Sequence, residues 1–302
     1  MSDLDRFVKK QRRVDRLFNM VGILCTVSAL TVLVLLLLDL TADGLARLDA
    51  EFFRAFPSRR PEQAGILSAW VGSALLMLVT GTTAIPLGVA AGIYLEEYAP
   101  KNWTTRVIEV NITNLAAVPS IVFGLMALGL FVYQFQFGQS VLSGGLALAF
   151  LALPIVIVAT REALRAIPEP IREAAFALGA SRWQVVRHHL LLYSAGGIAT
   201  GVIISLSRAV GETAPLVTIG ALTFIAFLPP APLSGSPPFV SVEWLESPFT
   251  ALPIQIFNWV SRPGDDFLAN AAAAGLVLMG GTLLMNAVAI TVRHRMRRRI
   301  KW

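Results

Sequence analysis

Arg208 and Glu212 are two opposite charges that stand four positions apart in an otherwise apolar stretch. Within residues 188–242, Arg208 is the only Lys or Arg and Glu212 is the only acid. A guanidinium presents a planar fork of donors that suits an oxyanion. A carboxylate at the i+4 position of a helix lies on the same face, so it can neutralise the arginine, tune it or repel a bound anion. The pair therefore indicates either a structural ion pair inside a helix bundle or a site on an anion pathway.

A second ordered segment, "IPEPIREAAFALGASRWQVVRHH", lies at residues 167–189. Pro170 suits the first turn of a helix, and Gly179 is a natural stop at its end. Ser181 followed by Gln184 predicts a capping box that begins a second helix. One face of the first helix is small and apolar, and it carries Ile171, Ala174, Ala175 and Leu178. A helix, a sharp turn and a second helix are expected here, either lying on the membrane surface or docking on a partner protein.

The composition indicates what positions these residues. Hydrophobic residues make up 55% of the 302-residue chain and charged residues 15%, with a mean hydropathy of +0.67. Soluble domains carry roughly 25% charged residues, and apolar runs of about 20 residues are long enough to cross a bilayer as helices. We therefore predict an all-α integral membrane protein with six transmembrane helices, from apolar runs at 17–38, 64–95, 110–133, 141–160, 195–228 and 267–292.

The distribution of Lys and Arg predicts the orientation. If the N-terminus is cytoplasmic, nineteen of the 25 Lys and Arg residues lie in inner segments, five lie in outer segments, and Arg208 lies within a span. Positive residues concentrate on the cytoplasmic side of membrane proteins, so both termini are expected in the cytoplasm. The predicted segments are a basic N-tail (1–16), a first transmembrane helix (17–40), an outer loop (41–65), a five-helix core (66–292) with an inner loop (161–192) and an outer loop (229–266), and a basic C-tail (293–302).

Prolines and glycines recur in the middle spans. Each of the four middle spans contains a proline that is expected to break or kink its helix: Pro86, Pro119, Pro154 and Pro215. They indicate either packing kinks or a hinged core between two straight outer helices. The small-residue pairs Gly88/Gly92 and Gly197/Gly201 predict close helix contacts. In the outer loop, "SPFTALPIQIFNW" (247–259) is too short to span and is expected to be interfacial or re-entrant.

The sequence lacks the residue patterns expected of a disulfide, a cysteine-based metal site, an ATP-binding loop or a membrane-embedded enzyme. The single cysteine, Cys25, rules out an internal disulfide or a cysteine-based metal site. No Lys follows a Gly, so the chain lacks the phosphate-binding loop of ATPases. A membrane-embedded enzyme would need several acids and histidines within the spans, whereas the spans contain one acid and none of the three histidines. No catalytic residue and no metal ligand is assigned.

The inner loop resembles the EAA loop of ABC-importer permeases through Glu173-Ala174-Ala175 and Gly179. The longer strings "REAAFALGASRW" and "GIATGVIISLSRAVGETAP" are similar to the phosphate-specific branch, as are "AVPSIVFGL", "LPIVI" and "SPFTALPIQIFNW". The "GETAP" segment resembles the A-type permease more than its C-type sister. The likeness extends over roughly residues 67–289. The sequence departs from many importers at Leu192, where they have a proline, and this departure is expected to soften a bend into the fifth span.

The resemblance implies a type I ABC importer permease fold with a cytoplasmic coupling helix, in the cytoplasmic membrane. The expected function is movement of inorganic phosphate, driven by ATP hydrolysis on a partner subunit. The expected partners are a C-type sister permease, two copies of a cytoplasmic ATPase and an extracytoplasmic phosphate-binding protein. A phosphate-signalling partner is a further expectation. ATP and Mg²⁺ are expected on the ATPase, with no cofactor in this chain. Coupling is assigned to Glu173, Ala174, Ala175 and Gly179, and the substrate pathway to Arg208, Glu212, Thr213 and Ser120.

Several alternatives remain open on the sequence alone. The same machinery could carry sulfate or molybdate, or the chain could be the C-type sister permease. A scaffold for a sensor kinase is another possibility, and it could coexist with transport.

Overall fold

The computed structural model describes residues 3–232, 239 and 241–298. These residues form helices and connecting segments, without a strand in the described part of the chain. Five helices are long and apolar enough to cross a membrane, or six if one sharply bent pair is counted as a span. The predicted all-α membrane fold is confirmed, although two of the six predicted spans have a different form.

A tight three-helix core consists of α3 (Leu67–Ile93), α6 (Val141–Arg165) and α9 (Leu191–Gly211). Glycines bring these helices together, because a β-carbon at Gly88 would lie 2.7 Å from Val156 and one at Gly197 would lie 2.6 Å from Ala163. Gly92 and Gly201 meet α6 in the same way. The predicted close contacts at both small-residue pairs are therefore confirmed. Pro86 and Pro154 lie inside α3 and α6, which stay continuous around them.

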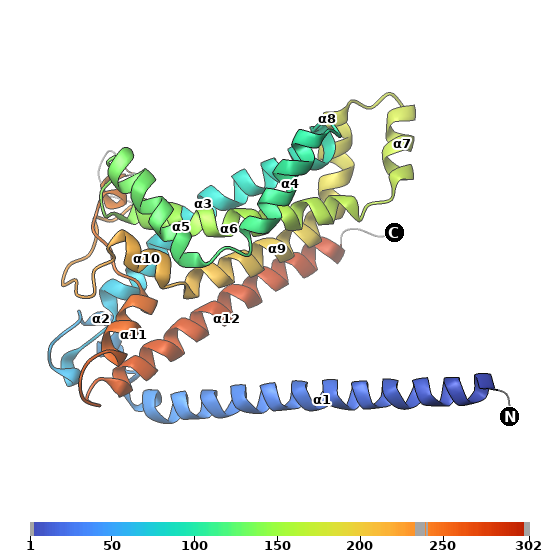
Figure 1. Ribbon diagram of the computed structural model, residues 1–302. Helices are drawn as coiled ribbons and strands as arrows, with labels where there is room; N and C mark the ends of the chain where they lie inside the picture. Colours follow the sequence, from blue (N-terminus) through green and yellow to red (C-terminus); the bar gives the residue numbers. More distant parts are fainter. Residues whose placement is uncertain (1–2, 233–238, 240, 299–302) are drawn as a thin grey trace.

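The third predicted span is a bent pair of shorter helices. The helix α4 (Trp103–Leu115) meets α5 (Ser120–Ala127), which continues as a π-helical turn to Gln134, at an angle of 108°. Pro119 lies at this break, immediately before the first turn of α5. A proline disfavours helical backbone angles at the residue before it, so α4 does not continue into α5. Figure 1 shows α4 and α5 running in clearly different directions across the bundle.

The fifth predicted span is wrong at its C-terminal end. The helix α9 stops at Gly211, Glu212 is extended, and a short helix α10 (Ala214–Ile219) follows. Pro215 therefore lies in the first turn of α10 and not inside a transmembrane helix, in a position where its missing N–H costs little. At the other end, α8 (Arg182–Val185), a π-helical turn and α9 form one helical span from Arg182 to Gly211, without a break at Leu192.

The remaining helices lie around this core. The helices α1 (Asp3–Gly44) and α12 (Leu268–Arg298) converge where the backbone of Gly44 approaches Ala273, while the rest of α1 runs apart from the bundle (Figure 1). The helix α11 (Leu252–Val260) is buried against α3 and α12, with Ile254 and Trp259 fully enclosed. The described parts of the predicted tails continue α1 and α12 as helix. The last four residues of the C-tail, and residues 233–238 and 240 of the outer loop, lie outside the described residues.

Arg47 organises the segment between α1 and α3. Arg47 donates from Nε to the Asn270 side chain at 2.9 Å and from Nη2 to the carbonyl oxygens of Pro61 and Ala64 at 3.3 and 3.1 Å. The short helix α2 (Ala50–Arg54) follows directly and is capped by Asp49, which accepts from the Phe52 N–H. One side chain thus ties the segment after α1 to the start of α12.

Candidate functional site

The Arg208–Glu212 pair lies where α9 ends. Arg208 Nε donates to Glu212 Oε1 at 3.2 Å, and the two side chains are 41% and 18% exposed. Glu212 has left the helix, with φ −78° and ψ 121°, so the two residues pair across the helix end and not along one helical face as predicted. Among the described residues, only Nε of the Arg208 guanidinium makes a hydrogen bond. Its two terminal nitrogens are therefore free to donate to an oxyanion.

The two predicted pathway hydroxyls lie at the N-terminal ends of two helices that pack together. Thr213 immediately precedes α10, and Ser120 is the first residue of α5. The helices touch at Gly124, where a β-carbon would lie 2.6 Å from Pro215 Cα. The structure therefore brings the segment after Arg208 against the break between α4 and α5. No hydrogen bond between described residues joins either hydroxyl directly to Arg208.

The predicted helix, turn and helix of the inner loop are confirmed. The first helix is α7 (Glu169–Ala177), and Gly179 follows it with φ +83°, a conformation that favours glycine. The capping box is present, since Ser181 Oγ accepts from the Gln184 N–H and the Gln184 side chain accepts from the Ser181 N–H. In Figure 1 this segment stands out from one end of the bundle.

The predicted apolar face of α7 is divided between the core and solvent. Ala175 is buried in a cluster with Leu164, Ile167, Val185, Val186 and Leu190. In contrast, Glu173 and Ala174 are exposed, and Leu178 is 90% exposed. One side of α7 therefore fixes it to the transmembrane helices, and the other side is available to a partner.

Arg172 is the main polar tie between α7 and the bundle. Nε and Nη2 both donate to Glu97 Oε1, at 3.3 and 3.0 Å. Nη1 donates to the Ile167 carbonyl at 2.8 Å, and Nη2 also donates to the Leu164 carbonyl at 2.9 Å. The Leu164 carbonyl belongs to the last turn of α6, and the Ile167 carbonyl belongs to the turn that follows it. All three guanidinium nitrogens are therefore engaged by the protein.

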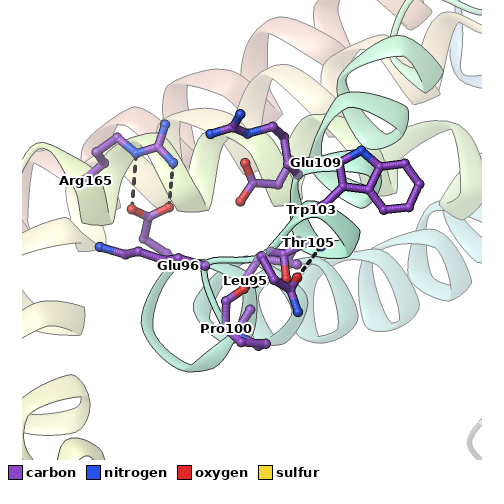
Figure 2. A pocket seen from close by; sticks show the side chains of 11 residues that line it. Leu95, Glu96, Pro100, Trp103, Thr105, Glu109 and Arg165 are labelled. Carbon is purple, nitrogen blue, oxygen red and sulfur yellow. Dashed lines mark hydrogen bonds and ion pairs between the residues drawn. The ribbon is translucent and has the colours of Figure 1, made fainter.

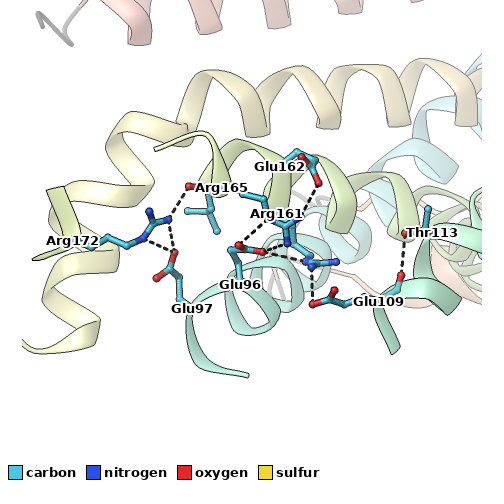
Figure 3. Close-up of polar contacts among 9 residues, drawn as sticks. Glu96, Glu97, Glu109, Thr113, Arg161, Glu162, Arg165 and Arg172 are labelled. Atoms are coloured by element: carbon cyan, nitrogen blue, oxygen red, sulfur yellow. Dashed lines mark hydrogen bonds and ion pairs between the residues drawn. The ribbon is translucent and has the colours of Figure 1, made fainter. Parts of the chain in front are cut away.

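Three further ion pairs continue this network toward α4, as Figure 3 shows. Arg161 lies 3.5 Å from Glu96 and 2.7 Å from Glu109 of α4, measured from Nε to Oε2 and from Nη2 to Oε1. Arg165 donates to both oxygens of Glu96, at 3.1 and 2.9 Å. Ion pairs thus join the turn after α3 to α6 and α7, and join α6 to α4.

A polar pocket of about 430 Å³ opens beside this network, between the end of α3 and the start of α4 (Figure 2). Glu96, Glu109 and Arg165 line it together with Trp103 and Thr105. Glu96 is already bound by Arg165 through two hydrogen bonds. Within the described part of the chain, no three His, Cys, Asp or Glu side chains gather where they could hold a metal ion.

The sequence reasoning missed this network. Glu96, Glu97 and Glu109 lie at the ends of predicted spans, and the sequence pattern does not pair them with the arginines of residues 161–192. The signal that could have found them is topological. The predicted orientation already places these acids and Arg161, Arg165 and Arg172 on the same side of the membrane.

Comparison with known proteins places the chain among transport proteins. Residues 84–298 match the family described as binding-protein-dependent transport system inner membrane component. The chain is 33% identical over 85% of its length to the phosphate transport system permease protein PstA of Xylella fastidiosa strain Temecula1, covering 85% of that protein. It is 34% identical to PstA of Yersinia pestis, over 82% of this chain and 78% of that one. A probable ABC transporter permease of Bacillus subtilis, YqgI, is 32% identical, over 84% of this chain and 87% of that one.

Solved transporters share the fold. A subunit of the bacterial alginate ABC transporter matches 95% of this chain and 97% of its own, with a TM-score of 0.66 and 12% identity. A subunit of the inward-facing MetNI methionine ABC transporter matches 76% of this chain and 95% of its own, with a TM-score of 0.59 and 17% identity. These identities show the fold alone, whereas the family match extends over most of the chain. The chain belongs to the family of binding-protein-dependent transport system inner membrane components.

Proposed function

We propose that this chain is the A-type permease subunit of an ABC importer for inorganic phosphate. The observation that carries the proposal is the identity of 33–34% to permeases named for phosphate transport, over more than four fifths of the chain. The fold and the family fit a transport subunit, and neither supplies a nucleotide-binding loop to this chain. Movement of the anion is the role of this subunit, and hydrolysis of ATP is the role of its partner.

The geometry at Arg208 supports an oxyanion as the cargo. Its two terminal nitrogens donate no hydrogen bond to any described residue, and the side chain is 41% exposed. A guanidinium fork binds phosphate through two parallel hydrogen bonds, each stronger than a neutral one. Glu212 holds Arg208 through Nε alone, so it orients the fork while leaving it open. The same carboxylate repels a bound anion and thereby favours its release. Thr213 and Ser120 are proposed to line the adjoining part of the pathway.

The inner loop supports coupling to a cytoplasmic ATPase. The exposed side of α7 ends in Leu178, and it projects beyond the transmembrane helices. Glu173, Ala174 and Gly179 form the exposed docking segment in this proposal, and the buried Ala175 holds that segment against the bundle. The ATPase subunits bind ATP and Mg²⁺, and their closure biases the permease pair between inward and outward states. A C-type sister permease and an extracytoplasmic phosphate-binding protein complete the importer, with both termini of this chain in the cytoplasm.

Uptake of radiolabelled phosphate into proteoliposomes tests this proposal. The vesicles contain the complete transporter with ATP inside and the loaded binding protein outside. ATP-dependent phosphate uptake is expected, with little competition from sulfate or molybdate. Uptake that sulfate or molybdate competes away, without phosphate movement, would assign the same machinery to another oxyanion.

A further inference from the structure

One residue of the ion-pair network, Arg172, joins α7 both to the end of the α3 span and to the end of α6. Arg172 lies on α7, one position before the exposed Glu173 and Ala174. Its side chain is 11% exposed, and that of its partner Glu97 is 13% exposed. Arg172 is therefore inside the protein, while the neighbouring residues face a partner.

The contacts of Arg172 reach two different transmembrane helices. Glu97 belongs to the π-helical turn Tyr94–Tyr98 that ends the α3 span. The carbonyls of Leu164 and Ile167 belong to the end of α6 and the turn after it. Among the described residues, α3 and α6 share the most extensive helix contact, with Gly88 and Gly92 of α3 packed against α6. A displacement of Arg172 therefore acts on two transmembrane helices that pack against each other.

Other contacts between α7 and the bundle are apolar and less directional. Ala175 and Ile171 pack into the cluster around Leu164 and Val186. Apolar side chains can slide past one another, because burial energy depends on area and not on direction. Four charge-assisted hydrogen bonds hold one geometry, and they cannot be kept while α7 shifts alone. The polar tie, and not the apolar cluster, fixes the angle between α7 and the span of α3.

We propose that Arg172, through Glu97 and the end of α6, is the positioning residue that transmits movement of the docking helix α7 to the transmembrane core. The inference rests on the proposed function, since it requires an ATPase that moves α7. Arg172 does not touch the anion or the nucleotide. Its loss leaves the ATPase bound and able to hydrolyse ATP, but separates that hydrolysis from the transmembrane helices.

The test compares Arg172→Gln and Glu97→Gln with wild type in proteoliposomes that contain the complete transporter. Three quantities are measured: copurification of the ATPase, basal ATP hydrolysis, and the stimulation of hydrolysis and uptake by the loaded binding protein. Both variants are expected to retain the ATPase and its basal rate. Anion uptake per ATP is expected to fall at least about tenfold, which corresponds to one lost charge-assisted hydrogen bond of about 1.4 kcal/mol. Arg172→Lys, which keeps a charged donor, is expected to recover part of the loss.

Glu162→Gln is the matched control. Glu162 pairs with Arg165 at 3.5 Å at the same end of α6, but both side chains are more than half exposed. This variant is expected to couple like wild type. If Arg172→Gln does not assemble, Glu97→Gln decides the question, since it keeps the bonds from Arg172 to the α6 carbonyls.

Wild-type uptake per ATP in Glu97→Gln and Arg172→Gln would overturn the inference. Loss of the bound ATPase in Glu97→Gln would also overturn it, because the residue would then serve docking and not transmission. The proposed function fails separately, if wild-type vesicles take up sulfate and not phosphate. The ratio of uptake to hydrolysis then still tests Arg172 with the anion that is carried.

Discussion

Arg172 and Arg208 each pair with a glutamate, at opposite ends of the same transmembrane core. They differ in how many of their hydrogen-bond donors the protein occupies. Arg172 is nearly buried and gives all three nitrogens to Glu97 and to backbone carbonyls. Arg208 is 41% exposed and gives only Nε to Glu212. A saturated guanidinium has no donor left for a ligand, whereas an open one does. The number of donors left free therefore separates an arginine that positions a helix from one that can bind an anion.

The backbone around the two arginines also differs. Around Arg172, the acceptors are the Glu97 carboxylate and two carbonyls, one in the last turn of α6 and one just after it. Around Arg208, the helix itself has ended at Gly211, and the next residues turn toward α10. Arg172 thus fastens α7 to the helix bundle, whereas Arg208 lies where a helix ends and keeps donors free.

The largest expected effect comes from removing the open fork. Arg208→Gln is expected to lower phosphate uptake at least about 100-fold, since two charge-assisted hydrogen bonds of about 1.5 kcal/mol each are lost and each 1.4 kcal/mol is tenfold. Assembly with the partner subunits should remain intact. Uptake in proteoliposomes and copurification measure the two properties separately. Arg208→Lys serves as the control that keeps the charge without the fork, and an intermediate rate is expected. Failure of Arg208→Gln to insert or assemble would show that the pair is structural and would remove the contrast with Arg172.

The second effect concerns the turn that presents α7. Gly179 has φ +83°, so Gly179→Val is expected to cost about 1–3 kcal/mol locally and to turn Leu178 and α8 away from their positions. Stimulation of ATP hydrolysis by the phosphate-loaded binding protein should fall strongly. Gly196→Ala is the control, because Gly196 is helical and a β-carbon there meets no atom within 4 Å. Normal stimulation in Gly179→Val would contradict the assignment of this turn to coupling.

The third effect compares stability at the two arginines. Breaking a buried ion pair typically costs about 3–5 kcal/mol, because an uncompensated charge is left behind. For an exposed pair the cost is about 0–1 kcal/mol. Arg172→Gln is therefore expected to lower the unfolding midpoint in detergent by several degrees, and Arg208→Gln should lower it less, because Arg208 is 41% exposed although Glu212 is 18% exposed. Thermal unfolding followed by fluorescence on both purified variants measures the difference. Equal shifts would mean that Arg208 is as firmly built into the fold as Arg172.

The sequence predicted the membrane fold, the small-residue contacts and the helix–turn–helix of the inner loop, because each depends on local pattern. Length and hydropathy identify spans. Ser181 and Gln184 form a capping box through their own side chains, and Gly179 tolerates the positive φ that ends a helix. The end of α9 at Gly211 was not predicted, because apolar residues continue to 228 and hydropathy does not register where a helix stops. The Glu97–Arg172 pair was missed because its members lie 75 positions apart, and only the packing of α3 on α6 brings them together.

The smallest expected effect is at the exposed end of the network. Glu162→Gln removes one partner of Arg165, which keeps its two hydrogen bonds to Glu96. Since both members of the Glu162–Arg165 pair are more than half exposed, the free energy of unfolding should change by less than about 0.5 kcal/mol. Glu96→Gln is the opposite case, because Glu96 is 15% exposed and contacts both Arg161 and Arg165. Thermal unfolding of the two variants side by side should give no measurable shift for the first and a clear decrease for the second. If Glu162→Gln destabilises the protein as much as Glu96→Gln, burial does not decide which of these charges holds the helices together, and the distinction between Arg172 and Arg208 loses its physical basis.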